Sequence, residues 1–138
     1  MNQNLFSIII PARINSLRFK NKILHLIDGL PMIEHVRRRA SLSKKIYKVF
    51  VASNEDKILN IVSKYNGHTI KTKKRHKNGT SRAAEACCKI NSKYIIIIQG
   101  DEPLLYPKYI DQITNYILKD EKYDMWCCYS NLNSNKDL

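Results

Sequence analysis

The sequence predicts an α/β fold in which an open, mostly parallel sheet is flanked by helices. Short runs of apolar and β-branched residues alternate along the chain with segments whose apolar residues recur at helical spacing. Parallel strands are usually joined through a helix, so this alternation indicates a parallel sheet. The 138 residues suit one domain. We expect that domain to span residues 1–130 and to be followed by a polar tail over residues 131–138.

The amino-terminal third predicts the first strand and the first helix. The apolar run Leu5–Ile10 stops at Pro11, which is typical of a buried strand that ends there. The dipeptide Asp28-Gly29 favours a turn, and Pro31 suits the first position of a helix. The apolar residues of this helix recur at helical spacing, and they are Met32, Ile33, Val36 and Ala40.

A strand, a helix and a second strand are expected next. Tyr47–Ala52 is a short apolar run, and Ser53 can cap the following helix, with Asp56 three residues on in the manner of a capping box. Gly67 suits the end of this helix, and His68–Lys71 predicts a weak strand. The apolar face of the helix consists of Ile58, Ile61, Val62 and Tyr65.

The remaining chain continues the alternation. A helix is predicted from Gly79 to about Ile90. Tyr94–Ile98 is a continuous β-branched run, which is typical of a strand covered on both faces. Pro107 begins another helix, and Tyr123–Tyr129 predicts a last strand. We expect four residues of the Pro107 helix to face inward, namely Tyr109, Ile110, Ile113 and Ile117.

The net charge of +12 and the pI near 9.6 suit an anionic partner such as nucleic acid, a membrane surface or a nucleotide. The cations are spread along the chain, however, so we interpret most of them as solvated surface.

Cysteines occur as the adjacent pairs Cys87-Cys88 and Cys127-Cys128, without the CxxC spacing of a zinc or redox centre, and buried, reduced thiols are expected. The first apolar run is broken at Pro11, so no signal peptide or membrane span is predicted, and a cytoplasmic location is expected.

Charged side chains of opposite sign follow two of the predicted strands. Arg13, Arg18 and Lys22 come after the first strand, and Asp101 comes after the strand that ends at Ile98. The carboxyl ends of parallel strands meet at one edge of a sheet, so we expect these side chains to lie close together. Cations can take phosphate oxygens while a carboxylate holds Mg²⁺ against the same oxygens. This combination predicts a site for a metal triphosphate, and the absence of GxxxxGK[ST] and GxGxxG motifs argues against Walker-type and dinucleotide sites.

Four segments, taken in order, resemble motifs of the sugar-acid cytidylyltransferases. Residues 8–24 read IIIPARINSLRFKNKIL, and residues 29–40 read GLPMIEHVRRRA. Residues 78–86 read NGTSRAAEA, and residues 95–105 read IIIIQGDEPLL. The QGDEP element is more similar to 3-deoxy-manno-octulosonate (Kdo) cytidylyltransferases than to the neuraminate enzymes. The resemblance spans Phe6–Pro107 and implies a Rossmann-like nucleotidyltransferase fold, truncated to its nucleotide-binding half.

The resemblance also implies roles for individual residues. The CTP phosphates are contacted by Arg13, Ser16, Arg18 and Lys22. The nucleotide is read by Gln99 together with the backbone of Pro11 and Ala12, and the same cleft is lined by Thr80 and Arg82. By the same resemblance we expect Asp101 to be the Mg²⁺ ligand, and Arg13, Lys22 and Asp101 to take part in catalysis. The family reaction is attack of the anomeric hydroxyl of a sugar acid on the α-phosphate of CTP, which gives a CMP-sugar and pyrophosphate for lipopolysaccharide or other cell-surface polysaccharide synthesis.

Some positions and the length depart from the family pattern. Lys20 stands where the family usually has Pro, Asn78 where it has Ser, and Ser53-Asn54 where Thr-Asp is common. Family members are longer, and their second half contributes a dimer-forming segment, much of the sugar-acid pocket and a second acidic metal ligand. A homodimer, or a partner chain that supplies this half, is therefore also an expectation.

Two other functions remain open at this point. The chain can be a truncated or split CTP-binding module without activity of its own. It can also be a small basic nucleic-acid-binding protein, which the charge and the run Thr72–Asn78 favour. No recognised nucleic-acid-binding motif accompanies that run, so CTP and a sugar acid are the expected partners and neither nucleic acid nor a membrane is.

Overall fold

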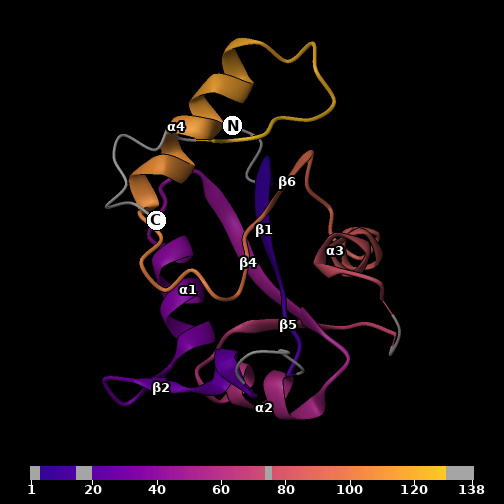
Figure 1. Ribbon diagram of the computed structural model, residues 1–138. Coiled ribbons are helices and arrows are strands. Elements are labelled where there is room, and N and C mark those ends of the chain that lie inside the picture. Colours follow the sequence, from indigo (N-terminus) through magenta and orange to yellow (C-terminus); the bar gives the residue numbers. More distant parts are fainter. Residues whose placement is uncertain (1–3, 15–19, 74–75, 130–138) are drawn as a thin grey trace.

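The computed structural model describes residues 4–14, 20–73 and 76–129. Its centre is a four-stranded parallel sheet in the order β5-β4-β1-β6 (Figure 1). The strands are β1 (Phe6–Pro11), β4 (Ile46–Ser53), β5 (His68–Lys71) and β6 (Tyr94–Ile97). The helices are α1 (Met32–Ser41), α2 (Asp56–Lys64), α3 (Gly79–Cys87) and α4 (Pro107–Lys119). This order confirms the predicted alternation and the parallel α/β sheet.

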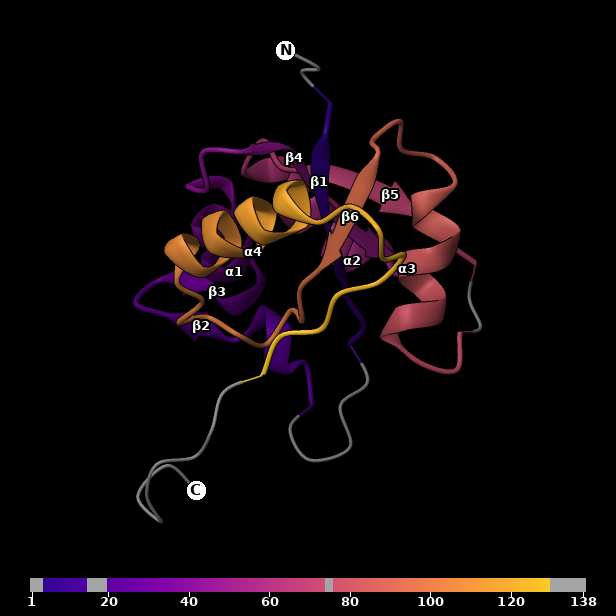
Figure 2. The ribbon, with the colours of Figure 1, turned by 90° about the horizontal axis from the view of Figure 1, so that it is seen from above.

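Strand β1 is the central strand and supplies both layers of the core. Ile8 and Ile10 pack on the face covered by α1, α2 and α4, whereas Ile9 packs on the face covered by α3. Figure 2 shows α1 and α4 on one side of the sheet and α3 on the other. Alternate side chains of a strand point to opposite faces, so a run of Ile residues is buried on both sides. The apolar run of β1 is thus explained by helices that cover both faces of the sheet.

A small antiparallel ribbon lies between β1 and α1. It consists of β2 (Leu26–Ile27) and β3 (Leu30–Pro31), and the short 3-10 helix η1 (Lys22–Leu24) precedes it. Asp28 and Gly29 form the two-residue connection with positive φ angles of 49° and 75°, as tight hairpins require. The predicted turn is confirmed, but the ribbon around it was not predicted.

The end of α2 depends on Asn66 and Gly67. Asn66 has a positive φ of 57°, and the Gly67 N–H donates to the Val62 carbonyl at 2.9 Å. A Cβ at Gly67 would lie 2.5 Å from Val62 Cγ1 and 2.8 Å from Arg37 Nε. The predicted stop at Gly67 is therefore confirmed, although Asn66 takes the left-handed position that Gly usually occupies and Gly67 is needed for close packing.

Several local predictions are wrong. Ser53 does not cap α2, because the helix begins three residues later at Asp56, and the Ser53 hydroxyl instead accepts from the Glu55 N–H at 3.2 Å. The last strand, expected over Tyr123–Tyr129, is absent from the described residues 120–129, although Trp126 packs edge-on against the Tyr94 ring. Strand β6 consequently lies at the edge of the sheet. The predicted coverage of its two faces holds in part, because Ile95 and Ile96 pack against the core clusters on opposite faces, whereas Ile97 is 43% exposed.

Two predictions of burial are also wrong. All four cysteines are exposed and free rather than buried. In α4 the side chains of Ile110 and Ile117 are buried, whereas Tyr109 is 61% exposed and lies beside Tyr106. Tyrosine tolerates this position because its ring carries a polar hydroxyl at the solvent end. Within the residues described, no helix is both long and apolar enough to span a membrane.

Candidate functional site

Four loops meet where the parallel strands end. The loop after β1 is held to the loop after β4, because the Ala12 N–H donates to the Ala52 carbonyl at 2.9 Å and the Ile14 N–H donates to Glu55 Oε2 at 2.5 Å. The Thr72 N–H, just after β5, donates to the Ser53 carbonyl at 2.9 Å. These bonds align the loops at the carboxyl edge of the sheet, where ligands of open α/β sheets bind.

An ion pair joins the first and last of these loops. Lys22 Nζ lies 2.8 Å from Asp101 Oδ2, although the residues are 79 positions apart in the sequence. The side chains are 36% and 45% exposed, respectively, so both are open to a ligand from solvent. The predicted proximity of the cationic and acidic loops is therefore confirmed for Lys22 and Asp101.

The position of Asp101 depends on the packing of its neighbours in the chain. Gly100 is buried, and a Cβ there would lie 3.1 Å from Ile33 Cδ1 and 3.5 Å from Ile10 Cγ2. Ile23, on η1 next to Lys22, packs in the same core cluster. The apolar core therefore fixes the backbone on both sides of the ion pair, while the charged groups stay at the surface.

Gln99 lies beside the amino-terminal end of α3. A Cβ at Gly79 would lie 3.1 Å from Pro11 Cγ and 3.7 Å from Gln99 Oε1, so Gly79 permits the close approach of these three residues. Pro11 and Ala12 are buried, whereas Gln99 is exposed. The structure thus brings together Gln99 and the end of β1, as predicted, and leaves the amide of Gln99 accessible.

Arg82 projects from the first half of α3 toward the same edge. It is only 5% exposed, and its Nη1 donates to Thr72 Oγ1 at 2.7 Å. Burial lowers the pKa of Arg82, the carboxylates of Glu55 and Glu85 oppose this shift, and the charge of Arg13 lowers the pKa further. Arg13 is itself exposed. Two guanidinium groups and Glu55 therefore lie within electrostatic reach of one another.

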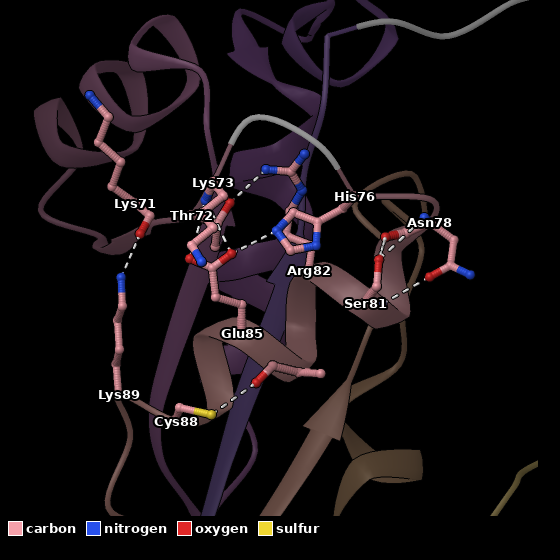
Figure 3. Close-up of polar contacts among 11 residues, drawn as sticks. Lys71, Thr72, Lys73, His76, Asn78, Ser81, Arg82, Glu85, Cys88 and Lys89 are labelled. Carbon is pink, nitrogen blue, oxygen red and sulfur yellow. Dashed lines mark hydrogen bonds and ion pairs between the residues drawn. The ribbon is translucent and has the colours of Figure 1, made fainter.

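Glu85, one helical turn beyond Arg82, holds the loop that precedes α3 (Figure 3). The Lys73 N–H donates to both carboxylate oxygens of Glu85 at 3.1 Å, and His76 Nε2 lies 2.7 Å from Oε2. The N–H of Lys73 is the main cause of the lowered pKa of Glu85; burial opposes it, and the His76 contact lowers the pKa further. Glu85 thus stabilises the loop as a carboxylate.

We expect the contribution of Glu85 to stability to depend on pH. A pKa that is lowered in the folded state means that the contribution is fully present above the ordinary glutamate range and is lost as the pH falls through the folded-state value. The difference in urea midpoint between the wild type and Glu85→Gln should be largest near neutral pH. It should shrink below about pH 4, and a pH-independent difference would contradict this role.

The other predicted site residues are placed as follows. Thr80 is exposed in the first turn of α3, and Asn78 begins that helix through a reciprocal capping pair with Ser81. Ser16 and Arg18 lie outside the described residues. Sequence reasoning assigned no role to Glu55 or Glu85. Glu55 could have been found from the sequence, because it follows the end of β4 by two residues and that strand ends at the carboxyl edge of the sheet.

Asp101 is the described residue best suited to hold a divalent cation. Its carboxylate is half exposed, and Glu102 follows it with a pKa raised first by burial and then by the charge of Asp101. Among the described residues there is no group of three or more His, Cys, Asp or Glu side chains that could hold a metal. Mg²⁺ is commonly bound by one or two carboxylates together with substrate phosphates. The side chains present fit such a shared site, in which the nucleotide supplies the remaining oxygens.

The sequence of this chain is similar to those of cytidylyltransferases. Residues 7–138 match the cytidylyltransferase family. The 3-deoxy-manno-octulosonate cytidylyltransferase of Pelobacter propionicus is 38% identical over 117 residues, which cover 85% of this chain and 46% of the relative. The 8-amino-3,8-dideoxy-manno-octulosonate cytidylyltransferase of Shewanella woodyi is 38% identical over 110 residues, which cover 78% of this chain and 45% of the relative.

Among solved structures, CMP:2-keto-3-deoxy-manno-octonic acid synthetase in complex with CTP superposes with a TM-score of 0.83 and 33% identity. The match covers 86% of this chain and 49% of that one, which confirms the predicted nucleotidyltransferase fold. This chain spans about half the length of the curated relatives that it matches. The alignment over nearly all of the chain and the likeness of the fold lead to one conclusion: this chain belongs to the cytidylyltransferase family.

Proposed function

We propose that this chain binds CTP and Mg²⁺ at the carboxyl edge of its sheet, as the nucleotide-binding half of an enzyme that transfers CMP from CTP to Kdo and releases pyrophosphate. The Lys22–Asp101 contact carries this proposal, because a cation and a carboxylate from loops distant in sequence lie side by side, and such a carboxylate can hold a metal ion. The proposal is supported by relatives named as Kdo cytidylyltransferases and by a neighbour solved with CTP.

The cations of the site suit the phosphate tail of the nucleotide. Lys22 and Arg13 are open to solvent, and charge-assisted bonds to phosphate are among the strongest that side chains make. Lys22 contacts Asp101 in the free chain, and a phosphate oxygen can replace that carboxylate as its partner. We assign the amide of Gln99 and the backbone of Pro11 and Ala12 to the nucleoside.

Asp101 would hold Mg²⁺ together with phosphate oxygens of CTP. The cation, when bound, would neutralise charge on the phosphates and so favour attack at the α-phosphorus. In the proposed reaction the anomeric hydroxyl of the sugar acid gives up its proton to water, its oxygen forms a bond to that phosphorus, and the bond to pyrophosphate breaks. The contribution of Arg13 and Lys22 is to align the phosphate tail and to stabilise the charge of the leaving pyrophosphate. We propose that the protein acts in the cytoplasm, where CTP is made.

Calorimetric titration with CTP tests the nucleotide and metal assignments. We expect Mg²⁺ to strengthen binding of CTP to the wild type, because Asp101 and the phosphates would share the cation. In Asp101→Asn the affinity should be the same with and without Mg²⁺, while the circular dichroism spectrum stays unchanged because the side chain is half exposed. A magnesium effect that survives in Asp101→Asn would place the metal elsewhere.

The sugar acid needs a separate test, since relatives named for two different acids are each 38% identical to this chain, over 117 and 110 residues. Pyrophosphate release from CTP should be measured with Kdo and with its 8-amino analogue. For residues 1–138 alone we expect transfer to be very slow, because the matched region spans about half of the relatives and positioning of the acceptor contributes many orders of magnitude to the rate. Joining the second half of the Pelobacter propionicus enzyme to this chain should restore transfer to Kdo.

A further inference from the structure

The loop from Thr72 to Asn78, here called the basic segment, is anchored to the fold at both ends. Its first residue continues the pairing of β5 with β4 through the Thr72 N–H and the Ser53 carbonyl. At its other end, Asn78 Oδ1 accepts from the Ser81 N–H at 2.8 Å. The described ends of the basic segment are therefore held by the fold, and Thr72 lies at the carboxyl edge of the sheet next to the candidate site.

Two residues of α3 hold the start of the basic segment. Arg82 and Glu85 are three positions apart, so they lie on the same face of the helix. Arg82 Nη1 donates to the hydroxyl of Thr72, and both residues are buried, at 5% and 6% exposure. Glu85 accepts from the N–H of the next residue, Lys73, and contacts His76 (Figure 3). Two adjacent residues, Thr72 and Lys73, are thus held by two side chains of α3.

The surroundings of Arg82 show why such support matters. Burial is the main cause that lowers the pKa of Arg82, the carboxylates of Glu55 and Glu85 raise it, and the charge of Arg13 lowers it further. A guanidinium that is not held in place would lose rotamer freedom on binding a ligand. The hydroxyl of Thr72 holds the guanidinium in one place, and Glu85 holds the backbone that carries Thr72.

We propose that Thr72 and Glu85 are positioning residues for the nucleotide site. They hold the guanidinium of Arg82 at the carboxyl edge of the sheet, so that this cation is already in place when the polyanion binds. This inference rests on the proposed CTP-binding function and adds two residues, neither of which is assigned to contact the nucleotide. Preorganisation of one long side chain is expected to be worth roughly 2- to 10-fold in affinity.

A double-mutant cycle measured by CTP titration tests the inference. Thr72→Val keeps the shape of the side chain and removes the acceptor, and Glu85→Gln keeps the shape and removes the charge. Each should weaken CTP binding by roughly 2- to 10-fold in the wild type and should have no further effect in an Arg82→Met background. Asp56→Asn is the matched control, because it removes one carboxylate that contacts neighbouring Lys71 at an exposed site, and its CTP affinity should equal that of the wild type.

A second measurement follows the contact without any nucleotide. Hydrogen exchange at the Lys73 amide should be faster in Glu85→Gln than in the wild type and unchanged in Asp56→Asn. If Thr72→Val weakens CTP equally with and without Arg82, or if Glu85→Gln accelerates exchange but leaves CTP binding unchanged, the positioning role is wrong while the proposed function stands. If the wild type binds no CTP, the proposed function fails and the positioning role fails with it.

Discussion

Replacing Arg37 with Met should reduce the free energy of unfolding by about 3–5 kcal/mol, as expected when one partner of a buried ion pair is removed. Glu34 is completely buried in α1, and Arg37 Nε and Nη2 donate to its two carboxylate oxygens, each at 2.7 Å. Arg37 Nη2 also donates to the Tyr65 carbonyl at 3.2 Å, which ties α1 to the end of α2. Without the guanidinium, a buried carboxylate loses its main partner. Urea denaturation measures the loss.

Arg38→Met is the matched control for this prediction. Arg38 also reaches Glu34, at 3.4 Å, but its side chain is 51% exposed. Its removal should change the free energy of unfolding by less than about 1 kcal/mol. Adding Glu34→Leu to Arg37→Met should recover much of the loss, because an apolar pair of similar volume avoids burying a charge. Equal destabilisation by Arg37→Met and Arg38→Met would show that the buried pair is not what stabilises α1.

Lys22→Met should weaken CTP binding by roughly 10- to 150-fold, the equivalent of about 1.5–3 kcal/mol for one charge-assisted hydrogen bond. CMP, which lacks the outer phosphates, should lose much less. The fold should be unaffected, because the Lys22–Asp101 pair is solvent-exposed and such pairs contribute little to stability. Calorimetric titration with both nucleotides measures the difference.

Lys20→Met is the control for Lys22→Met. Lys20 is an exposed cation in the same loop and is not assigned to the nucleotide site. Its replacement therefore removes the same charge but no residue of the site. Its effect on CTP should be small. A similar loss in both variants would mean that the net charge attracts the nucleotide, and an equal loss for CTP and CMP in Lys22→Met would move Lys22 away from the outer phosphates.

The meeting of Lys22 and Asp101 could be predicted because it depends on topology rather than on side-chain detail. Apolar runs identified β1 and β6 as strands, and parallel strands bring their carboxyl ends to one edge. The turn at Asp28 and Gly29 was predictable for a similar reason, since only a few residue types accept positive φ angles. Backbone rules of this kind act locally, and they hold whatever packs around the segment.

Burial could not be predicted as well, since it depends on which neighbours are present. Tyr109 and Ile110 are adjacent in α4, and the helical pattern assigned both to the apolar face, whereas only Ile110 faces the core. The β-branched run of β6 predicted a strand covered on both faces; Ile95 and Ile96 do pack on opposite faces, but Ile97 is 43% exposed. Glu34 and Arg37 have the spacing of an ordinary surface pair, so nothing in the pattern revealed that Glu34 is buried.

Binding of CTP at the carboxyl edge of the sheet can be tested with a chemical-shift map of the ¹⁵N-labelled chain. Addition of CTP with Mg²⁺ should cause the largest shifts in the amide signals of Arg13, Gly79 and Asp101, which lie at this edge after β1, at the start of α3 and after β6. Signals from the opposite end of the sheet, such as those of Lys44 and Asn91, should remain unchanged. Shifts confined to other regions, or no shifts at millimolar CTP, would contradict the assignment of this edge as the nucleotide site.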